Sequence, residues 1–314
     1  MPIPGTPPLV TVFGGGGFIG RYVCEALIKA GVRLRVAERN PRNAFFLQPL
    51  GQLGQIALTS ADLARPQTIE RAVEGANAVV NLVGIFKGNL QAVHVDGAGR
   101  AAAAAREAGA ASFVQVSAIG ADPESASTYG RTKGLGERAV REAFPDATII
   151  RPSVVFGSED DFTNRFAAMA RFPIAPVIAP RTRFQPVFAR DLGRAIAMAA
   201  LEPQRFGGHA YDIAGPEVLT MRELNQRIAA MAGQSPDFVD VPDFVAGAIA
   251  KLGFLPGAPL SSDQWTMLQN DNVAADDASG LEAFGIVPTP LAAVAPDWLG
   301  RFVRGGRFAP RANA

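Results

Sequence analysis

Five glycines stand within seven residues near the start of the chain, in the stretch VFGGGGFIGRYV. Before them, residues 9–13 (LVTVF) have the apolar and β-branched composition of a short buried strand. After them, residues 18–30 have the apolar spacing of a helix, which Gly31 is placed to end. Glycines between a strand and a helix permit a tight turn and let a phosphate group approach the helix N-terminus, whose N–H groups attract it. The stretch therefore predicts the first strand, turn and helix of a dinucleotide-binding domain, although a tight turn without a ligand has the same local pattern.

Strand-like and helix-like runs alternate through the first half of the chain. The strand-like runs after the first are residues 32–37, 55–58, 78–84, 112–117 and 147–155. Helix-favouring runs such as 68–75 and the alanine-rich 98–110 lie between them. Alternation of this kind is typical of parallel βαβ units. We therefore expect an α/β fold with a Rossmann-type doubly wound parallel sheet over residues 1–155.

The regular alternation weakens in the second half, where prolines become frequent and helical runs return near 188–201 and 220–232. We expect residues 156–314 to form a smaller C-terminal lobe, with some return to the first domain near 185–200. Ligands of such folds bind at the carboxyl edge of the sheet. A lobe over that edge would contact a substrate or a partner.

Composition narrows the class of protein. With 48% apolar and 19% charged residues, the chain has ample material for a folded core, and a formal net charge of +1 gives no electrostatic basis for binding nucleic acid. The single cysteine, Cys24, excludes an intramolecular disulfide, and His94 and His209 have no ligand-spaced neighbours, so we expect no metal site. The first residues lack a basic segment followed by an apolar one, and no run approaches about 18 apolar residues. These features predict a cytoplasmic protein or one at the cytoplasmic face of a membrane.

The glycine spacing fits two variants of the phosphate-binding pattern. Gly14, Gly17 and Gly20 satisfy G-x-x-G-x-x-G, whereas replacing the first of these with Gly15 satisfies G-x-G-x-x-G, so spacing alone does not choose between them. In either variant, we expect the turn and the first helical residues to bind the cofactor diphosphate. These residues are Gly14, Gly17, Phe18, Ile19 and Gly20.

The end of the second strand normally decides which dinucleotide is bound, because a carboxylate there holds the ribose 2′-hydroxyl and an arginine accepts a 2′-phosphate. Here Glu38 and Arg39 compete for that role. Arg39, supported by Arg42 and Arg21, could chelate a phosphate through its guanidinium. We therefore predict NADP(H) in preference to NAD(H).

Two further strand ends are expected to border the cofactor. Asp62, followed by Leu63, comes after the third strand, where its carboxylate could accept a hydrogen bond from the adenine amino group or cap the following turn. Val83 and Gly84 end the run at 78–84 and are expected to lie beside the dinucleotide.

A second pattern lies in STYGRTKGLGERAV, where Tyr129 and Lys133 are four residues apart at the start of a helical run. Residues at i and i+4 share a helix face, so the ammonium can lie near the phenol oxygen. That arrangement lowers the pKa of a phenol and makes it usable as an acid or base near neutral pH. Ser117, at the end of strand 112–117, would lie at the same sheet edge and could hydrogen-bond a substrate carbonyl. Tyr129, Lys133 and Ser117 are therefore the candidate catalytic residues.

The segments VFGGGGFIG, YGRTK and IIRPSVVFG together resemble the extended or atypical branch of the short-chain dehydrogenase/reductase superfamily, over at least residues 9–200. The resemblance implies that Tyr129 is the acid/base, that Lys133 also binds the nicotinamide ribose and that Ser117 orients the substrate. It further implies a segment along the nicotinamide, at residues 151–155 with Pro152 and Val154.

A narrower resemblance extends beyond these shared motifs. TVFGGGGFIGRYV, YGRTKGLGE, RPSVVFGSEDDFTNRFA, FQPVFARDLGRAI and FGIVPTPL are similar to segments of the NADPH-binding accessory subunit of respiratory complex I and its bacterial relatives. This implies a bound NADPH that serves structure, complex I core subunits as partners, and Tyr129 and Lys133 mainly as ribose ligands. The alternative is an active NADP-dependent oxidoreductase or sugar-nucleotide-type epimerase or dehydratase, in which Tyr129 passes a proton.

Two departures from active members weaken the case for turnover. The fifth strand ends in Ser117, Ala118 and Ile119, with one hydroxyl where many active members have a cluster. Phe13 stands where a threonine usually precedes the first glycine.

The C-terminal part mixes aromatic and basic residues, which suits docking on a protein or an anionic membrane surface but also an ordinary surface tail. These residues are Trp265, Trp298, Phe302, Phe308, Arg301, Arg304, Arg307 and Arg311. Peripheral attachment to the cytoplasmic face of the inner membrane is therefore one expectation. The acidic run at 158–164 is expected to be a solvated loop before a helix rather than a cation site.

Overall fold

A computed structural model describes residues 7–253 and 260–303, which form two compact units. The first unit contains the chain up to Pro152 together with Ala189–Ile213 and Ala275–Val287. The second contains Ser153–Phe188, Ala214–Ala274 and the chain from Pro288 onward.

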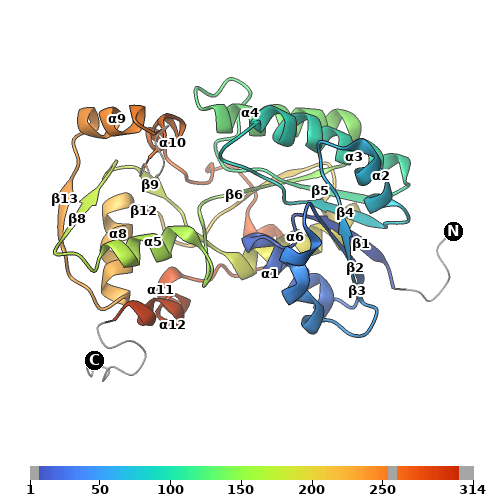
Figure 1. Ribbon diagram of the computed structural model, residues 1–314, viewed down its shortest axis with the longest axis horizontal. Helices are drawn as coiled ribbons and strands as arrows, with labels where there is room; N and C mark the ends of the chain where they lie inside the picture. The colour runs from blue at the N-terminus through green and yellow to red at the C-terminus, as the bar shows by residue number, and fades with distance from the viewer. Residues whose placement is uncertain (1–6, 254–259, 304–314) are drawn as a thin grey trace. The chain divides into compact units, whose positions relative to one another are not determined.

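A seven-stranded parallel sheet forms the centre of the first unit, with the strand order β11-β6-β5-β4-β1-β2-β3 (Figure 1). The strands are β1 (Leu9–Phe13), β2 (Arg33–Glu38), β3 (Ile56–Ser60), β4 (Ala78–Asn81), β5 (Ser112–Val116), β6 (Thr148–Pro152) and β11 (Ala210–Ile213). Val12 of β1 pairs with Val36 on one side and Val80 on the other. The strand order therefore reverses at β1, and the carboxyl ends of β1 and β4 flank the crevice where dinucleotides bind in doubly wound sheets. The predicted Rossmann-type fold is confirmed, with one strand, β11, that the sequence did not predict.

Helices cover both faces of this sheet (Figure 1). On one face are α1 (Phe18–Lys29) and α6 (Ala189–Leu201), and on the other are α2 (Pro66–Val73), α3 (Ala98–Glu107) and α4 (Thr128–Ala143). The unit also contains η1 (Pro41–Leu50), the π-helical turn η2 (Gln91–Gly97), α7 (Pro203–Phe206) and η3 (Leu281–Phe284). The helix expected at residues 18–30 is thus α1, and Gly31 follows its end with a φ of +78°, a conformation that favours glycine.

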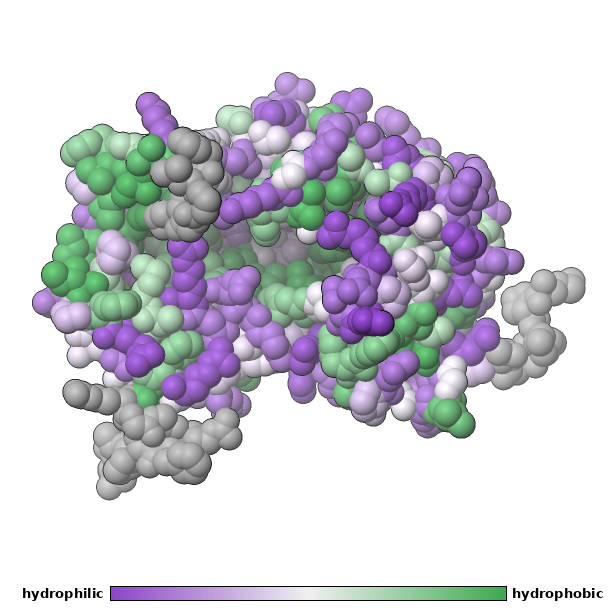
Figure 2. Space-filling model, in the orientation of Figure 1, coloured by the Kyte–Doolittle hydropathy of each residue, from purple (hydrophilic) through white to green (hydrophobic). Residues whose placement is uncertain are grey.

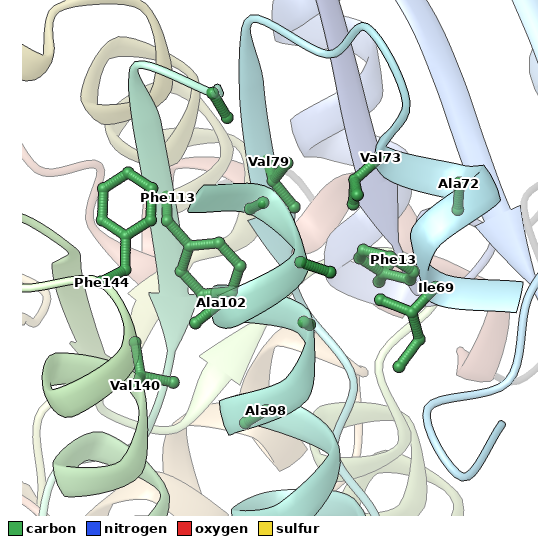
Figure 3. Close-up of a cluster of buried hydrophobic side chains, with 14 of the residues drawn as sticks. Phe13, Ile69, Ala72, Val73, Val79, Ala98, Ala102, Phe113, Val140 and Phe144 are labelled. Atoms are coloured by element: carbon green, nitrogen blue, oxygen red, sulfur yellow. The ribbon is translucent and has the colours of Figure 1, made fainter. Parts of the chain in front are cut away.

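Figure 3 shows the core between the central sheet and helices α2, α3 and α4, where the alanine-rich helix α3 packs. Ala98, Ala101, Ala102 and Ala105 of α3 recur at helical spacing, and each is fully buried. Their small side chains let the helix backbone lie close to the sheet, where larger residues fill the space. These are Phe13, Ile69, Val79, Phe113 and Val140.

The second unit holds three short strand pairs, six α-helices and one 3-10 turn among the described residues. The pairs are β7 (Val155–Phe156) with β10 (Val187–Phe188), β9 (Arg183–Phe184) with β12 (Leu219–Thr220), and β8 (Ile174–Val177) with β13 (Asp237–Asp240). The helices are α5 (Asp161–Met169), α8 (Met221–Met231), α9 (Asp243–Lys251), α10 (Ser262–Leu268), α11 (Leu291–Val294) and α12 (Pro296–Leu299), followed by the 3-10 turn η4 (Gly300–Phe302).

Two of the aromatic residues expected on a docking surface pack inside the second unit instead. Trp298 and Phe302 are partly buried against a core that includes Leu224 and Ile228. The Trp298 indole also donates a hydrogen bond to Thr163 Oγ1 at 3.4 Å. Of the remaining C-terminal residues of that prediction, Phe308, Arg304, Arg307 and Arg311 lie outside the described residues.

The acidic run at 158–164 contains the cap of a helix. The Asp160 carboxylate, 3% exposed, accepts hydrogen bonds from the Gly157 amide at 2.9 Å and from the amide and hydroxyl of Thr163, at the start of α5. Across residues 7–253 and 260–303, no helix has the length and apolar character needed to cross a membrane.

Candidate dinucleotide site

In the glycine-rich turn between β1 and α1, the three spaced glycines have different structural roles. Gly14 has a φ of +78°, which a residue with a side chain rarely adopts. A Cβ on Gly20 would lie 2.5 Å from the carbonyl oxygens of both Gly14 and Gly15, so only glycine lets α1 pack this close to the turn. Gly17 is exposed, and a Cβ there would approach only the Gly14 carbonyl oxygen, at 3.3 Å. The turn thus begins with a positive φ at Gly14, is open at Gly17 and is crowded at Gly20.

The N-terminus of α1 follows this turn directly and is suited to an anion. Gly17 is its N-cap residue, no side chain caps it, and its first turn contains no acidic residue. The amides of Phe18, Ile19 and Gly20 have no partner within the helix, because the first N–H groups of any helix lack one. These amides and the positive end of the helix dipole can bind a diphosphate.

Glu38, at the end of β2, contacts the same turn. Its Oε1 accepts a hydrogen bond from the Gly16 amide at 2.6 Å. Burial raises the pKa of Glu38, while this hydrogen bond and the charge of Arg39 act in the opposite direction. Arg39 itself is exposed, and the guanidinium of Arg21, expected to support it, lies over the ring of Phe46 at 4.2 Å. The Glu38 carboxylate therefore stabilises the turn through its hydrogen bond to Gly16, while Arg39 is exposed to solvent.

The ends of β3 and β4 complete this edge of the sheet. Asp62 makes the local contacts of a turn cap, since its Oδ1 accepts a hydrogen bond from the Ala64 amide at 3.0 Å. Leu63 beside it is buried. Val83 lies against the glycine-rich turn, because a Cβ on Gly14 would come within 3.4 Å of Val83 Cγ2. Val83 thus borders the glycine-rich turn, and contacts of these residues with a dinucleotide stay a prediction.

Gly84 connects the glycine-rich turn with the second predicted pattern, on α4. A Cβ at Gly84 would lie 3.3 Å from Lys133 Nζ and 3.9 Å from His94 Nε2. The Lys133 side chain, 6% exposed, crosses from α4 to the sheet and donates a hydrogen bond to the Val116 carbonyl at 3.1 Å. The ammonium therefore lies at the end of β5, within reach of a ribose bound over Gly84.

The predicted lowering of the Tyr129 pKa is wrong for this structure. Burial raises the pKa of Tyr129 to about 12, and burial lowers the pKa of Lys133 to about 8, although Glu137 acts against that shift. The ammonium is bonded to the Val116 carbonyl and lies 5.8 Å from the centre of the Tyr129 ring. Spacing of i and i+4 put both residues on one helix face, but burial has the larger effect on each pKa.

The side chain of Ser117, at the end of β5, is buried without a hydrogen-bond partner among the described residues. Its side chain is 4% exposed, and across the described residues its Oγ is the one buried side-chain polar atom without a hydrogen-bond partner. Leaving a buried hydroxyl unbonded costs about 1–3 kcal/mol. A ligand hydroxyl, amide or carbonyl at the end of β5 would remove that cost, so the residues present fit a nicotinamide dinucleotide.

Two residues of this site were missed by sequence reasoning. His94, 2% exposed in η2, accepts a hydrogen bond from the Ile85 amide at Nε2 (3.0 Å), and its Nδ1 lies 2.9 Å from Thr132 Oγ1. Phe86 stacks on the Tyr129 ring with centroids 4.7 Å apart, and His94 meets the same ring edge-on at 5.5 Å. Burial and the charge of Lys133 lower the pKa of His94 to about 4. No spacing in the sequence links a histidine 35 residues before the tyrosine to it, so only the folded structure shows this contact.

The first unit contains nearly all the predicted site residues. From the sequence list, it holds Gly14, Gly17, Phe18, Ile19, Gly20, Arg39, Asp62, Leu63, Val83, Gly84, Ser117, Tyr129, Lys133 and Pro152. Val154 belongs to the second unit, and its place along a nicotinamide stays a prediction.

A phosphate-suited turn at the switch point of a doubly wound sheet, with the ammonium of Lys133 reaching from α4 to the end of β5, defines a Rossmann-type nicotinamide-dinucleotide-binding protein. The model of the NAD(P)H-binding family matches residues 14–171, and the chain belongs to this family, within the short-chain dehydrogenase/reductase-like proteins.

Comparison with known proteins confirms the narrower resemblance as well. The chain is 34% identical to the mitochondrial subunit 9 of the NADH dehydrogenase (ubiquinone) 1 alpha subcomplex of Rattus norvegicus, over 90% of this chain and 77% of the rat protein. It is also 30% identical to a ceramide reductase of Caulobacter vibrioides, over 83% of this chain and 80% of that protein. In structure it is similar to an NADPH-dependent quinone oxidoreductase from Escherichia coli in complex with NADPH, with a TM-score of 0.76, 20% identity and coverage of 92% of this chain and 99% of that one.

Proposed function

We propose that this chain is an accessory subunit of a respiratory NADH:quinone oxidoreductase, in which a bound NADPH serves structure rather than turnover. The observation that carries the proposal is the surroundings of Tyr129. The ring is covered by Phe86, and burial raises the pKa of the phenol to about 12, so it is poorly matched to proton transfer near neutral pH. Similarity to subunit 9 of the rat enzyme over most of the chain supports the assembly.

Each part of the site has a role in holding the dinucleotide under this proposal. The amides at the start of α1 bind the diphosphate, and Lys133 and Tyr129 bind the nicotinamide ribose. Ser117 offers its buried hydroxyl to the nicotinamide side of the ligand. When bound, the cofactor could supply a hydride, but the chain's own residues act here as ligands that exclude water.

The direct test is native gel separation of membranes solubilised from cells that express the chain. We expect the chain and NADH:quinone oxidoreductase activity in one band. Consistent absence of the chain from that band would contradict the proposal.

Tyr129→Phe is expected to leave nucleotide content and migration with the complex nearly unchanged, because the stacked ring remains and only one hydroxyl is lost. Tyr211→Phe serves as the matched control in the same unit. Nucleotide released per mole of protein and the native gel measure the two outcomes. If the unmodified protein and Tyr211→Phe catalyse an NADPH-dependent reduction that Tyr129→Phe has lost, the chain is an active enzyme and the proposal is contradicted.

NADP(H) is the dinucleotide we propose, because Glu38 is bonded to the turn while Arg39 is exposed beside it and can form a forked contact with a 2′-phosphate. Mass spectrometry of nucleotide released from the purified protein is expected to find NADP(H) in excess. Arg39→Ala should reduce that excess by about tenfold, the effect of one lost charge-assisted hydrogen bond. Arg106→Ala, at an exposed position in the last turn of α3, is the control. Release of NAD(H) alone from the unmodified protein would refute this assignment.

A surface for partners is available on the second unit. Phe172, Ile174, Val239 and Phe244 are 51–80% exposed, and hydrophobic residues gather on the face that carries α9, β8 and β13 (Figure 2). In the parallel pair β8–β13, Ile174 and Val239 point to the solvent side. Exposed apolar groups of this size are typical of interaction sites. Under the proposal, this face contacts other subunits of the complex at the cytoplasmic face of the membrane.

A second candidate function is an active NADP-dependent reductase. It is favoured by the unpartnered Ser117 hydroxyl, which could bond a substrate carbonyl, and by the similarity to the ceramide reductase. In that case Tyr129 would pass a proton to the substrate, and a bound NADPH would supply the hydride.

A further inference from the structure

We propose that His94 is a positioning residue of the dinucleotide site. Its imidazole ties the segment after β4 to α4, and thereby holds Phe86 against Tyr129 and Gly84 over Lys133. The inference rests on the proposed function only in that this edge of the sheet binds the nicotinamide ribose.

The hydrogen bonds of His94 allow one protonation state. The Ile85 amide can only donate, so Nε2, which it contacts at 3.0 Å, must carry a lone pair. The remaining ring hydrogen is therefore on Nδ1, which donates it to Thr132 Oγ1 at 2.9 Å. The Thr132 hydroxyl in turn donates to the Thr128 carbonyl at 2.9 Å, within α4. His94 is thus a neutral ring with both nitrogens engaged, one on the segment after β4 and one on α4.

The backbone of His94 is held as firmly as its side chain. A Cβ on Gly136 of α4 would lie 2.0 Å from the His94 carbonyl oxygen, so η2 and α4 touch backbone to backbone at this point. η2 is a π-helical turn, a geometry that often occurs at functional sites. From this main-chain position, the imidazole contacts both the Ile85 amide and Thr132 Oγ1.

Ile85 lies between the two residues whose positions matter most. Gly84 precedes it and faces Lys133 Nζ, and Phe86 follows it and stacks on the Tyr129 ring at 4.7 Å. Because neighbouring residues share a backbone, one hydrogen bond at Ile85 restrains both. Because Phe86 is 64% exposed, its side chain is only partly held by packing, and the backbone restraint at Ile85 helps to keep it on the tyrosine.

The first measurement reads the His94 ring directly in the intact protein. The chain has two histidines, so ¹⁵N-histidine labelling gives two sets of ring resonances, and His209→Gln assigns them. We expect the His94 ring to be the neutral Nδ1–H form. A ring protonated on Nε2 would overturn the proposal.

The second measurement compares His94→Phe with His94→Gln. Phenylalanine keeps the ring shape without an acceptor, whereas glutamine can place an amide oxygen near the position of Nε2. For His94→Phe we expect hydrogen exchange of the Ile85 amide to become about tenfold faster and the NADPH dissociation constant to rise about tenfold. His94→Gln should restore both values to within about threefold of the unmodified protein.

Unchanged Ile85 exchange in His94→Phe, or faster exchange with unchanged NADPH affinity, would overturn the proposal. Equal loss in both variants would also do so, since it indicates that only the fold is affected. If His94→Phe does not fold, the ring spectrum of the unmodified protein and the measurements on His94→Gln still test the proposal. If the unmodified protein binds no nucleotide, the proposed function fails, whereas the ring spectrum and Ile85 exchange continue to test His94.

Discussion

Gly17→Val is expected to leave the first unit folded but without nucleotide, whereas Gly20→Ala is expected to unfold it. Gly17 is exposed, its φ of −78° suits any residue, and a Cβ meets only one carbonyl oxygen at 3.3 Å. Valine there projects from the turn into the space that a diphosphate needs. At Gly20 even a methyl group lies 2.5 Å from two backbone oxygens, which no rotamer change relieves. The cost of such overpacking against backbone is expected to exceed about 3 kcal/mol.

Circular dichroism on heating and nucleotide content after acid release distinguish these two glycines. We expect Gly17→Val to melt near the nucleotide-free form of the unmodified protein and to release less than about a tenth of its nucleotide. Gly20→Ala should show no cooperative transition or a strongly lowered Tm. Retention of nucleotide by Gly17→Val would show that the turn does not hold the diphosphate.

Lys133→Met is expected to abolish nucleotide retention and, at the same time, to stabilise the nucleotide-free protein. Burial lowers the pKa of Lys133 to about 8, whereas a lysine in the unfolded chain titrates near 10.4. At pH 7 the folded protein therefore holds a buried charge that the unfolded chain solvates better. Methionine has a similar shape without the charge, so we expect about 1–3 kcal/mol more stability, part of the gain being offset by the lost hydrogen bond to Val116.

The pH dependence of the free energy of unfolding provides a second test of the Lys133→Met prediction. Between about pH 8 and 10 the unfolded chain binds more protons at Lys133 than the folded one, so the free energy of unfolding of the unmodified protein rises with pH in that window. Lys133→Met should lose this rise. Above about pH 10 the raised pKa of Tyr129 acts oppositely, because the unfolded phenol loses its proton first. Denaturant unfolding at pH 7, 8, 9 and 10 measures the effect, with the exposed Lys251→Met as control. Lower stability of Lys133→Met throughout would contradict the argument.

Local patterns predicted the first unit well where each signal lies within one element. The run at residues 9–13 is strand β1, and the helix expected from Phe18 begins there. The glycine spacing also located the turn, because each glycine's role depends on atoms within a few residues. Strand β11 was missed, since AYDI at 210–213 is four residues long and its partner β6 ended at Pro152.

The electrostatics of the site could not be predicted in the same way. Sequence spacing put Lys133 on the same helix face as Tyr129, but not at the depth that shifts both pKa values. Nor does it show that His94 contacts Ile85 and Thr132, because these hydrogen bonds join three different segments. Such contacts depend on how elements pack, which periodicity does not record.

The division of the chain between its two units has a consequence for its synthesis. The chain passes between the units five times, at residues 152/153, 188/189, 213/214, 274/275 and 287/288. A ribosome delivers β6 long before β11, so during that interval the nascent sheet has an open, hydrogen-bonding edge along Thr148–Pro152. Newly made chains are therefore exposed to wrong strand pairing until residue 213 has emerged, and a fragment that stops near residue 155 would keep that open edge permanently.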